Sequence, residues 1–300
     1  MVRACVRRHA GPALGPRWAH ARPLSSCILS SDPKQRITRL YDSVAAEYAE
    51  KGPPFFDHAG RRLVEIAGVA EGQQVLDVAT GRGAVLFPAV GRVGPTGFVT
   101  GIDLAESMVT HTAREIARRG VTTAAVRVMD AEALECPAGS FDRVLCSFAV
   151  FFLTDLRAVL AGMFRVLKPG GVVGFAFIRG KDDRWRWYEA LLKEHGAFDD
   201  YPPRPGVPGI LKENRLVEFL IRAGFTDGVE TRESVDLDLG DEHTWWQSLW
   251  TNGSRAALER LPEPTLEIVR TEALARACAL KTEAGLLERH DFVYVTAVRP

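Results

Sequence analysis

The chain has 300 residues, of which 46% are hydrophobic and 25% charged, so it is long enough for one large α/β domain with an elaboration or for two small domains. Basic and acidic side chains number 38 each, and the absence of a net basic field argues against nucleic acid as a partner. No apolar run approaches the roughly 20 residues that a membrane-spanning helix needs, so we expect no integral membrane segment.

The first 31 residues differ from the rest, because they contain five arginines and no acidic residue. This composition is typical of a mitochondrial transit peptide, but Pro12, Pro16 and Pro23 would interrupt the amphipathic helix that import requires. We predict that residues 1–31 are a disordered extension or targeting segment and that one domain spans 32–300. The five cysteines never form a Cys-x-x-Cys pair, which favours a reducing compartment and argues against a metal site. The cytoplasm is the expected compartment, and the mitochondrial matrix is the alternative if 1–31 is a transit peptide.

Short β-rich runs alternate with amphipathic helical patterns through the body of the chain. This alternation predicts an α/β fold, with a doubly wound, mainly parallel, Rossmann-like sheet and helices on both faces. We expect seven strands, at 73–78, 97–102, 124–129, 142–147, 172–177, 229–237 and 290–298.

The first two predicted strands carry the most informative residues. The apolar run that ends at Asp77 is followed by Gly81 and Gly83, and the next strand ends at Asp103. Glycines let the backbone approach a ligand closely, and a strand-end carboxylate can accept hydrogen bonds from ribose hydroxyls. These residues predict a nucleoside pocket. A dinucleotide fingerprint would need a third glycine, but Leu86 stands there, which weakens the alternative of a nicotinamide cofactor.

Four further segments accompany the glycine turn in the same order as in a known family. They are Tyr41–Tyr48, Arg127–Ala131, Phe141–Ser147 and Leu167–Gly171. With the turn that Asp77 heads, they make residues 38–178 resemble the class I S-adenosylmethionine-dependent methyltransferases, although Ala79 stands where many relatives carry a glycine. In that family the segment at 41–48 would be an N-terminal helix over the cofactor.

The resemblance implies S-adenosylmethionine as cofactor and suggests its contacts. Asp103 would hold the ribose, Asp130 would meet the adenine amino group, and the backbone N–H of Ala131 would face a ring nitrogen. The other implied cofactor contacts are Asp77, Ala79, Thr80, Gly81, Gly83, Leu104, Met108, Ser147, Phe148 and Tyr48. The family also implies that the last two strands form an antiparallel hairpin at the sheet edge.

Two insertions leave the sheet at its carboxyl edge, where doubly wound sheets bind their ligands. They cover about 179–208 and 240–282, and we expect them to fold as a helical cap. The second insertion predicts helices at 241–258 and 264–280 and carries Trp245 and Trp246, whose spacing from Trp250 suits either core packing or contact with an acceptor.

Methyl transfer from a sulfonium requires alignment more than side-chain chemistry, so the sequence need not show a catalytic triad or a metal cluster, and we expect no metal. His58, His243 and Tyr41 are the candidates for a base, should the acceptor have to lose a proton. We therefore predict a methyltransferase that acts on O, N or C of a small, fairly apolar metabolite. An NAD(P)-dependent oxidoreductase and a non-enzymatic S-adenosylmethionine-binding protein are the alternatives, and a homodimer is one assembly that the sequence allows.

Overall fold

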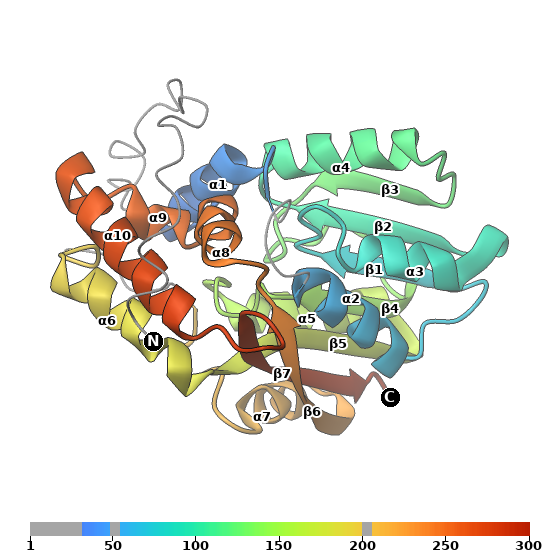
Figure 1. Ribbon diagram of the computed structural model, residues 1–300. Coiled ribbons are helices and arrows are strands. Elements are labelled where there is room, and N and C mark those ends of the chain that lie inside the picture. The colour runs from blue at the N-terminus through green and yellow to red at the C-terminus, as the bar shows by residue number, and fades with distance from the viewer. Residues whose placement is uncertain (1–31, 49–54, 200–205) are drawn as a thin grey trace.

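A computed structural model describes residues 32–48, 55–199 and 206–300. Its centre is a seven-stranded sheet with the order β3-β2-β1-β4-β5-β7-β6 (Figure 1). The strands are β1 (Gln74–Val78), β2 (Phe98–Asp103), β3 (Ala124–Val128), β4 (Phe141–Ser147), β5 (Leu167–Lys181), β6 (Thr226–Asp238) and β7 (Leu287–Val298). The pairs among β1 to β5 are parallel, and β7 runs antiparallel to both β5 and β6. The predicted fold class is confirmed, with β7 lying between β5 and the edge strand β6.

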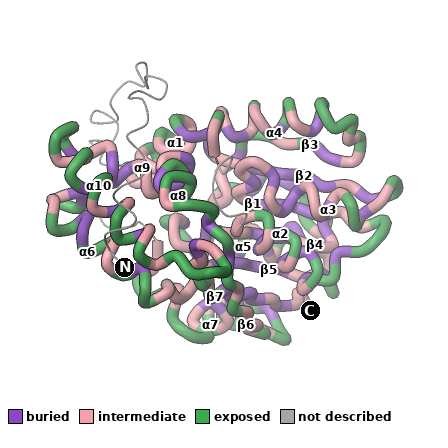
Figure 2. The backbone as a smooth tube through the Cα atoms, viewed as in Figure 1, coloured by how far each residue is buried: buried purple, intermediate pink, exposed green. Residues whose placement is uncertain are grey.

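Strand β1 shows why the sheet has two separate cores. Its side chains alternate in direction, so Val75 packs with the helices on one face, while Leu76 and Val78 pack with those on the other. The first face is covered by α2 (Phe55–Ile66), α3 (Leu86–Val93) and part of α4 (Glu106–Arg118), and the second by α5 (Leu156–Val166) and α7 (Arg215–Arg222). In Figure 2 the buried residues accordingly follow the central strands, and the outer sides of the helices are exposed.

A third core lies outside the sheet, among η3 (Asp183–Trp185), α6 (Arg186–Glu194), α8 (Glu242–Ser248), α9 (Arg255–Leu258) and α10 (Glu263–Ala279). Trp185, Trp245 and Trp246 are buried in it. These helices lie beside α1 (Pro33–Val44), at the end of the molecule toward which β1 to β4 run (Figure 1). We call this helical unit the cap.

Two predicted helices differ from those in the structure. The prediction of a single helix at 241–258 is wrong. The structure has two helices there, α8 and α9, separated by a short 3-10 turn and an extended residue, Asn252. The Asn252 side chain donates to the carbonyl oxygen of Ser248 and accepts from the backbone N–H of Ser254, so it competes with the helical hydrogen bonds. The helix expected at 41–48 begins earlier, because Asp32 caps its first turn and Pro33 occupies its first position, and it ends at Val44.

The predicted extension at 1–31 lies outside the described residues. Within the described part of the chain, no helix is long and apolar enough to cross a membrane.

Candidate active site

The loop after β1 is built on left-handed backbone. Ala79, Gly81 and Gly83 have φ angles of 57°, 50° and 88°, and the conformation costs least for glycine. The Thr80 hydroxyl donates to Asp77 Oδ2 over 2.6 Å, and the Thr112 hydroxyl donates to the Gly81 carbonyl oxygen, also over 2.6 Å. Side chains from β1 and α4 therefore hold the turn in place from both sides.

Asp103, at the end of β2, is held by the backbone around it. Its Oδ2 accepts from the Gly81 N–H over 2.8 Å, and its Oδ1 accepts from the Ala105 N–H over 2.9 Å. Burial raises the pKa of the Asp103 carboxyl, while these backbone hydrogen bonds lower it. The carboxylate is thus oriented by the same loop that shapes the ligand pocket.

Asp77 is more deeply placed than Asp103, with 1% of the residue exposed. Burial raises the pKa of its carboxyl to about 7. The hydrogen bond from Thr80 lowers this pKa, and the nearby charge of Asp103 raises it. Two acids that share one end of a pocket make that end favourable for a cation or for hydroxyl donors.

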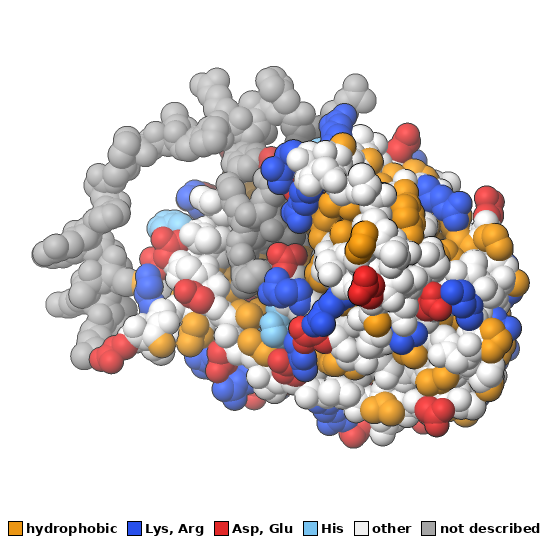
Figure 3. Space-filling model, turned by 90° about the vertical axis from the view of Figure 1, so that its right-hand side faces the viewer, with side chains coloured by type: hydrophobic (Ala, Val, Ile, Leu, Met, Phe, Trp, Pro, Cys, Tyr) orange, Lys and Arg blue, Asp and Glu red, His pale blue; other side chains and the backbone are white. Residues whose placement is uncertain are grey.

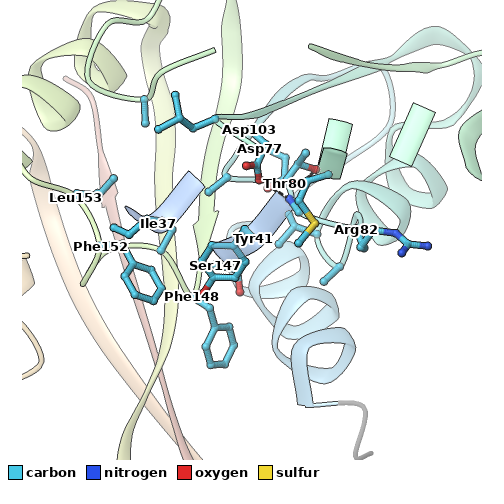
Figure 4. A pocket seen from close by; sticks show the side chains of 18 of the residues that line it. Ile37, Tyr41, Asp77, Thr80, Arg82, Asp103, Ser147, Phe148, Phe152 and Leu153 are labelled. Atoms are coloured by element: carbon cyan, nitrogen blue, oxygen red, sulfur yellow. Dashed lines mark hydrogen bonds between the residues drawn. The ribbon is translucent and has the colours of Figure 1, made fainter. Parts of the chain in front are cut away.

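A cavity of about 180 Å³ opens where β1, β2 and β4 end. In Figure 4, Asp77, Thr80 and Asp103 lie together in one part of it, and Ile37, Phe152 and Leu153 lie together in another. One end of the cavity is therefore polar and acidic, and the other is apolar.

The structure brings most of the expected site residues to this cavity. Its lining includes Tyr41, Tyr48, Asp77, Ala79, Thr80, Gly81, Asp103, Leu104, Met108, Asp130, Ala131, Ser147 and Phe148. Gly83 does not line it: a Cβ there would come within 2.6 Å of the Phe87 ring, so Gly83 allows the close approach of that ring.

The two histidine candidates lie elsewhere. His58 packs against the Phe292 ring at 5.0 Å, and its Nε2 is 3.6 Å from Glu233, on the sheet face under α2. His243 is exposed on α8. Neither lines the cavity, so of the three candidates for a base only Tyr41 does.

Several lining residues were not expected from the sequence. They are Lys34, Ile37, Phe56, Asp57, Arg82, Ala84, Val85, Met129, Glu132, Ala149, Phe152 and Leu153. Lys34 pairs with Asp130 at 2.7 Å and with Glu132 at 2.6 Å. Although burial alone would raise it, the pKa of Glu132 falls to about 2 because Lys34 and Thr154 donate to its carboxylate.

Helix α1 covers the cavity and is tied to three segments of the site. Lys34 binds the loop after β3, Asp42 accepts from the Ser107 N–H at the start of α4 over 2.8 Å, and Arg82 of the glycine loop donates to the Ala45 carbonyl oxygen over 2.5 Å. The helix is therefore part of the pocket wall.

Two observations indicate that the cavity is shaped for a ligand. The Ser147 hydroxyl is buried and has no hydrogen-bond partner in the described structure. A Cβ built on Gly81 would meet no atom within 4 Å, so there is open space above that backbone. An acid at Asp103, a donor or acceptor at Ser147 and apolar walls at Leu104 and Met108 fit an adenosyl group with a polar amino-acid tail.

Comparison with known proteins agrees with this geometry. The family profile described as "Methyltransferase domain" matches residues 75–171. The nocamycin O-methyltransferase of Saccharothrix syringae is 34% identical over 275 residues, which cover 87% of this chain and 98% of that protein. This chain belongs to the class I S-adenosylmethionine-dependent methyltransferases.

A second relative of this methyltransferase is the ubiquinone/menaquinone biosynthesis C-methyltransferase of Erwinia tasmaniensis. It is 30% identical over 241 residues, which cover 78% of this chain and 92% of that enzyme. Among solved structures, the YcgJ protein from Bacillus subtilis shares the fold, with a TM-score of 0.53, 16% identity, and coverage of 81% of this methyltransferase and 98% of YcgJ. Membership of this family sets aside the oxidoreductase alternative.

Proposed function

We propose that the methyltransferase binds S-adenosylmethionine in the cavity at the ends of β1, β2 and β4 and methylates a hydroxyl oxygen of a small, fairly apolar metabolite at the other end. The observation that carries the proposal is the division of the cavity into an acidic end with Asp77 and Asp103 and an apolar end with Ile37, Phe152 and Leu153. The first suits a cofactor with ribose hydroxyls and positive charge, and the second suits an apolar acceptor.

The cofactor contacts follow from the positions of the lining residues. Asp103 would accept from the ribose hydroxyls, which adds to the hydrogen bonds that already orient its two oxygens. Asp130 and the Ala131 N–H would bind the adenine edge, between the apolar side chains of Leu104 and Met108. Ala79, Thr80 and Gly81 would face the methionine part, with Ser147 as a partner for its polar groups.

When bound, the cofactor supplies a methyl group that is already activated. The protein then has to bring the acceptor oxygen into line with that methyl, within about 3–3.5 Å, and to exclude water. Helix α1 contributes Lys34, Ile37 and Tyr41 to the cavity wall and is held there by Lys34 and Arg82. Tyr48 is a poor base, because burial raises its pKa well above the usual value of 10.

Oxygen is the proposed acceptor atom because the relative that the chain covers almost completely is named an O-methyltransferase. The second full-length relative is named a C-methyltransferase, so carbon is the alternative. Identification of the methylated product distinguishes oxygen from carbon as the acceptor atom.

The test is a complete turnover. The purified protein is incubated with a metabolite extract and a methyl donor labelled in its methyl group, and labelled products are identified by mass spectrometry. A labelled methyl ether or ester supports the proposal, and a labelled carbon–methyl bond moves it to carbon. Cofactor binding without any labelled product would favour the non-enzymatic alternative.

The compartment, the oligomeric state and the partners of the protein stay predictions from the sequence. They are a cytoplasmic location, a homodimer and the absence of a nucleic-acid partner. On the face shown in Figure 3, basic and acidic side chains are interspersed. Light scattering tests the homodimer.

A further inference from the structure

We propose that the acceptor of this methyltransferase is a planar, conjugated molecule, held by a collar of aromatic rings that runs along the cavity wall and reaches its apolar end at Phe152. This inference rests on the proposed function and specifies its substrate class. The aromatic collar consists of Tyr41, Tyr48, Phe56, Phe148 and Phe152, all of which line the cavity.

The collar is continuous. The centroid of the Tyr41 ring is 5.8 Å from those of both Phe152 and Tyr48, the Tyr48 and Phe56 rings are 5.2 Å apart, and the Phe56 and Phe148 rings are 5.0 Å apart. These separations are typical of interacting aromatic pairs. Residues from α1, the turn after it, α2 and the loop after β4 thus form one aromatic wall.

Three of the four contacts within the collar are edge to face, and Phe56 also contacts the Phe55 ring, with the centroids 4.0 Å apart. The Tyr41–Phe152, Tyr41–Tyr48 and Phe56–Phe148 pairs are T-shaped, with interplanar angles of 76°, 71° and 79°. In a T-shaped pair the edge of one ring meets the face of the other. A flat ligand can add to such a wall by stacking or by edge contact, whereas a saturated one gains only its apolar area.

The collar differs from the aromatic residues that only pack the core. Phe175, Phe177 and Phe225 are almost fully buried within the fold. The Tyr41, Phe56, Phe148 and Phe152 residues are each only partly buried, and they face the cavity.

Phe148 supplies a second, independent observation. Its φ angle is 58°, a left-handed conformation that is unfavourable for a non-glycine residue, and its N–H donates to the Ala176 carbonyl oxygen over 2.8 Å. Strained backbone of this kind persists where the surrounding structure enforces it, and it clusters at ligand sites. Here it accompanies a ring that contacts both Phe55 and Phe56 of α2.

The test uses two probes with the same carbon skeleton, planar 2-naphthol and saturated decahydro-2-naphthol. Calorimetry measures their binding to the full chain loaded with S-adenosylhomocysteine. We expect 2-naphthol to bind about tenfold more tightly, because several ring contacts add to the burial of apolar area. Phe152→Leu should reduce that preference to about twofold and leave the affinity for S-adenosylhomocysteine unchanged. Phe219→Leu, on α7 and outside the cavity, is the matched control.

Equal affinity for the two probes, or no binding of either, would overturn the proposal. So would an equal loss for both probes in Phe152→Leu, because that result would show apolar burial without selection for planarity. Failure of the unmodified protein to bind S-adenosylhomocysteine would instead contradict the proposed function.

Discussion

Asp103 is oriented before any cofactor arrives. Both of its oxygens accept hydrogen bonds from backbone N–H groups, one from the glycine loop and one from the start of α4. A carboxylate that is fixed in this way would lose little conformational freedom on binding the ribose hydroxyls, the role proposed for Asp103.

Asp103→Asn should therefore weaken binding of S-adenosylmethionine by about tenfold or more, because a hydrogen bond to a charged group contributes about 1.5–3 kcal/mol. Isothermal calorimetry measures the affinity, and thermal unfolding shows whether the variant is folded. Asp183→Asn changes an acid whose side chain is 77% exposed and serves as the control. An affinity equal to that of the unmodified protein would refute the assignment of Asp103.

Asp77 predicts a pH dependence of stability. Its folded-state pKa of about 7 exceeds the ordinary value of 3.8, so between these values the folded protein holds a proton that the unfolded chain has released. The stabilising effect is complete below pH 4 and is lost as pH rises through 7.

Relative to Asp77→Asn, the unmodified protein should lose about 3 kcal/mol of unfolding free energy between pH 5 and pH 8. Urea unfolding at both pH values measures this difference, and the subtraction cancels groups common to both proteins. A difference between the two proteins that does not change with pH would show that Asp77 does not titrate in this range.

Residues at the ends of β1 and β2 could be predicted from the sequence because strand, turn and acid are adjacent along the chain. Ala79, placed where many relatives carry a glycine, nevertheless adopts a left-handed backbone conformation. Lys34 and Phe152 were missed because they reach the cavity through tertiary packing, and a residue type alone carries no signal of that. His58 and His243 were candidates by type only, and the fold directs them elsewhere.

At the scale of elements, side-chain contacts hold α1 to the rest of the cavity wall. Lys34 joins it to both Asp130 and Glu132, and the Lys34 side chain is 31% exposed. Ion pairs at this exposure contribute modestly, on the order of 1 kcal/mol.

Lys34→Met should accordingly raise the rate of amide exchange across 33–44 by about fivefold, because α1 would detach more often. Hydrogen–deuterium exchange with mass spectrometry measures this. Arg118→Met is the control, because it removes an ion pair with Glu115 that lies within α4. In this variant the amides of α1 should exchange as in the unmodified protein. An unchanged rate in Lys34→Met would mean that other contacts hold α1.

The sequence predicted most elements to within a few residues, because strand and helix periodicities are local. The prediction of one helix at 241–258 was wrong because the Asn252 side chain bonds to the backbone of Ser248 and Ser254 and breaks the helix there. Hydrophobic spacing continues through such a break and does not reveal it.

At the scale of the whole molecule, the cap has its own core beside the sheet. Trp245 is central to it, with ring centroids 5.0 Å from Trp185, 5.3 Å from Tyr188 and 5.9 Å from Trp187. No tryptophan of the described chain lines the cavity, so packing is the role that the structure shows for Trp245. The cap nevertheless borders α1, since a Cβ on Gly253 would lie 3.9 Å from the Tyr41 hydroxyl.

Trp245→Ala should lower the unfolding free energy by about 3–5 kcal/mol, the usual cost of removing a buried aromatic side chain. Affinity for S-adenosylmethionine should stay within about twofold of the original, because the proposed cofactor end of the cavity lies at the ends of the sheet strands. Urea unfolding and calorimetry measure the two quantities. Trp250→Ala, at a less buried position, should cost less. A large loss of cofactor affinity in Trp245→Ala would show that the cap shapes the cofactor end as well.

The doubly wound sheet could be predicted because the alternation of strands and helices covers the chain. The composition of the cavity's apolar end could not, because it is assembled from α1, α2 and the loop after β4, which are distant in sequence. Only folding brings these segments to one edge of the sheet.

The central claim is that the acids at the ends of β1 and β2 mark the cofactor site, and a crystal structure with S-adenosylhomocysteine tests it most directly. We expect the ribose hydroxyls on Asp103 and the adenine beside Asp130, with the sulfur directed toward Tyr41 and Phe152. An adenosyl group bound outside this cavity, with Asp103 still bound only by Gly81 and Ala105, would contradict the account.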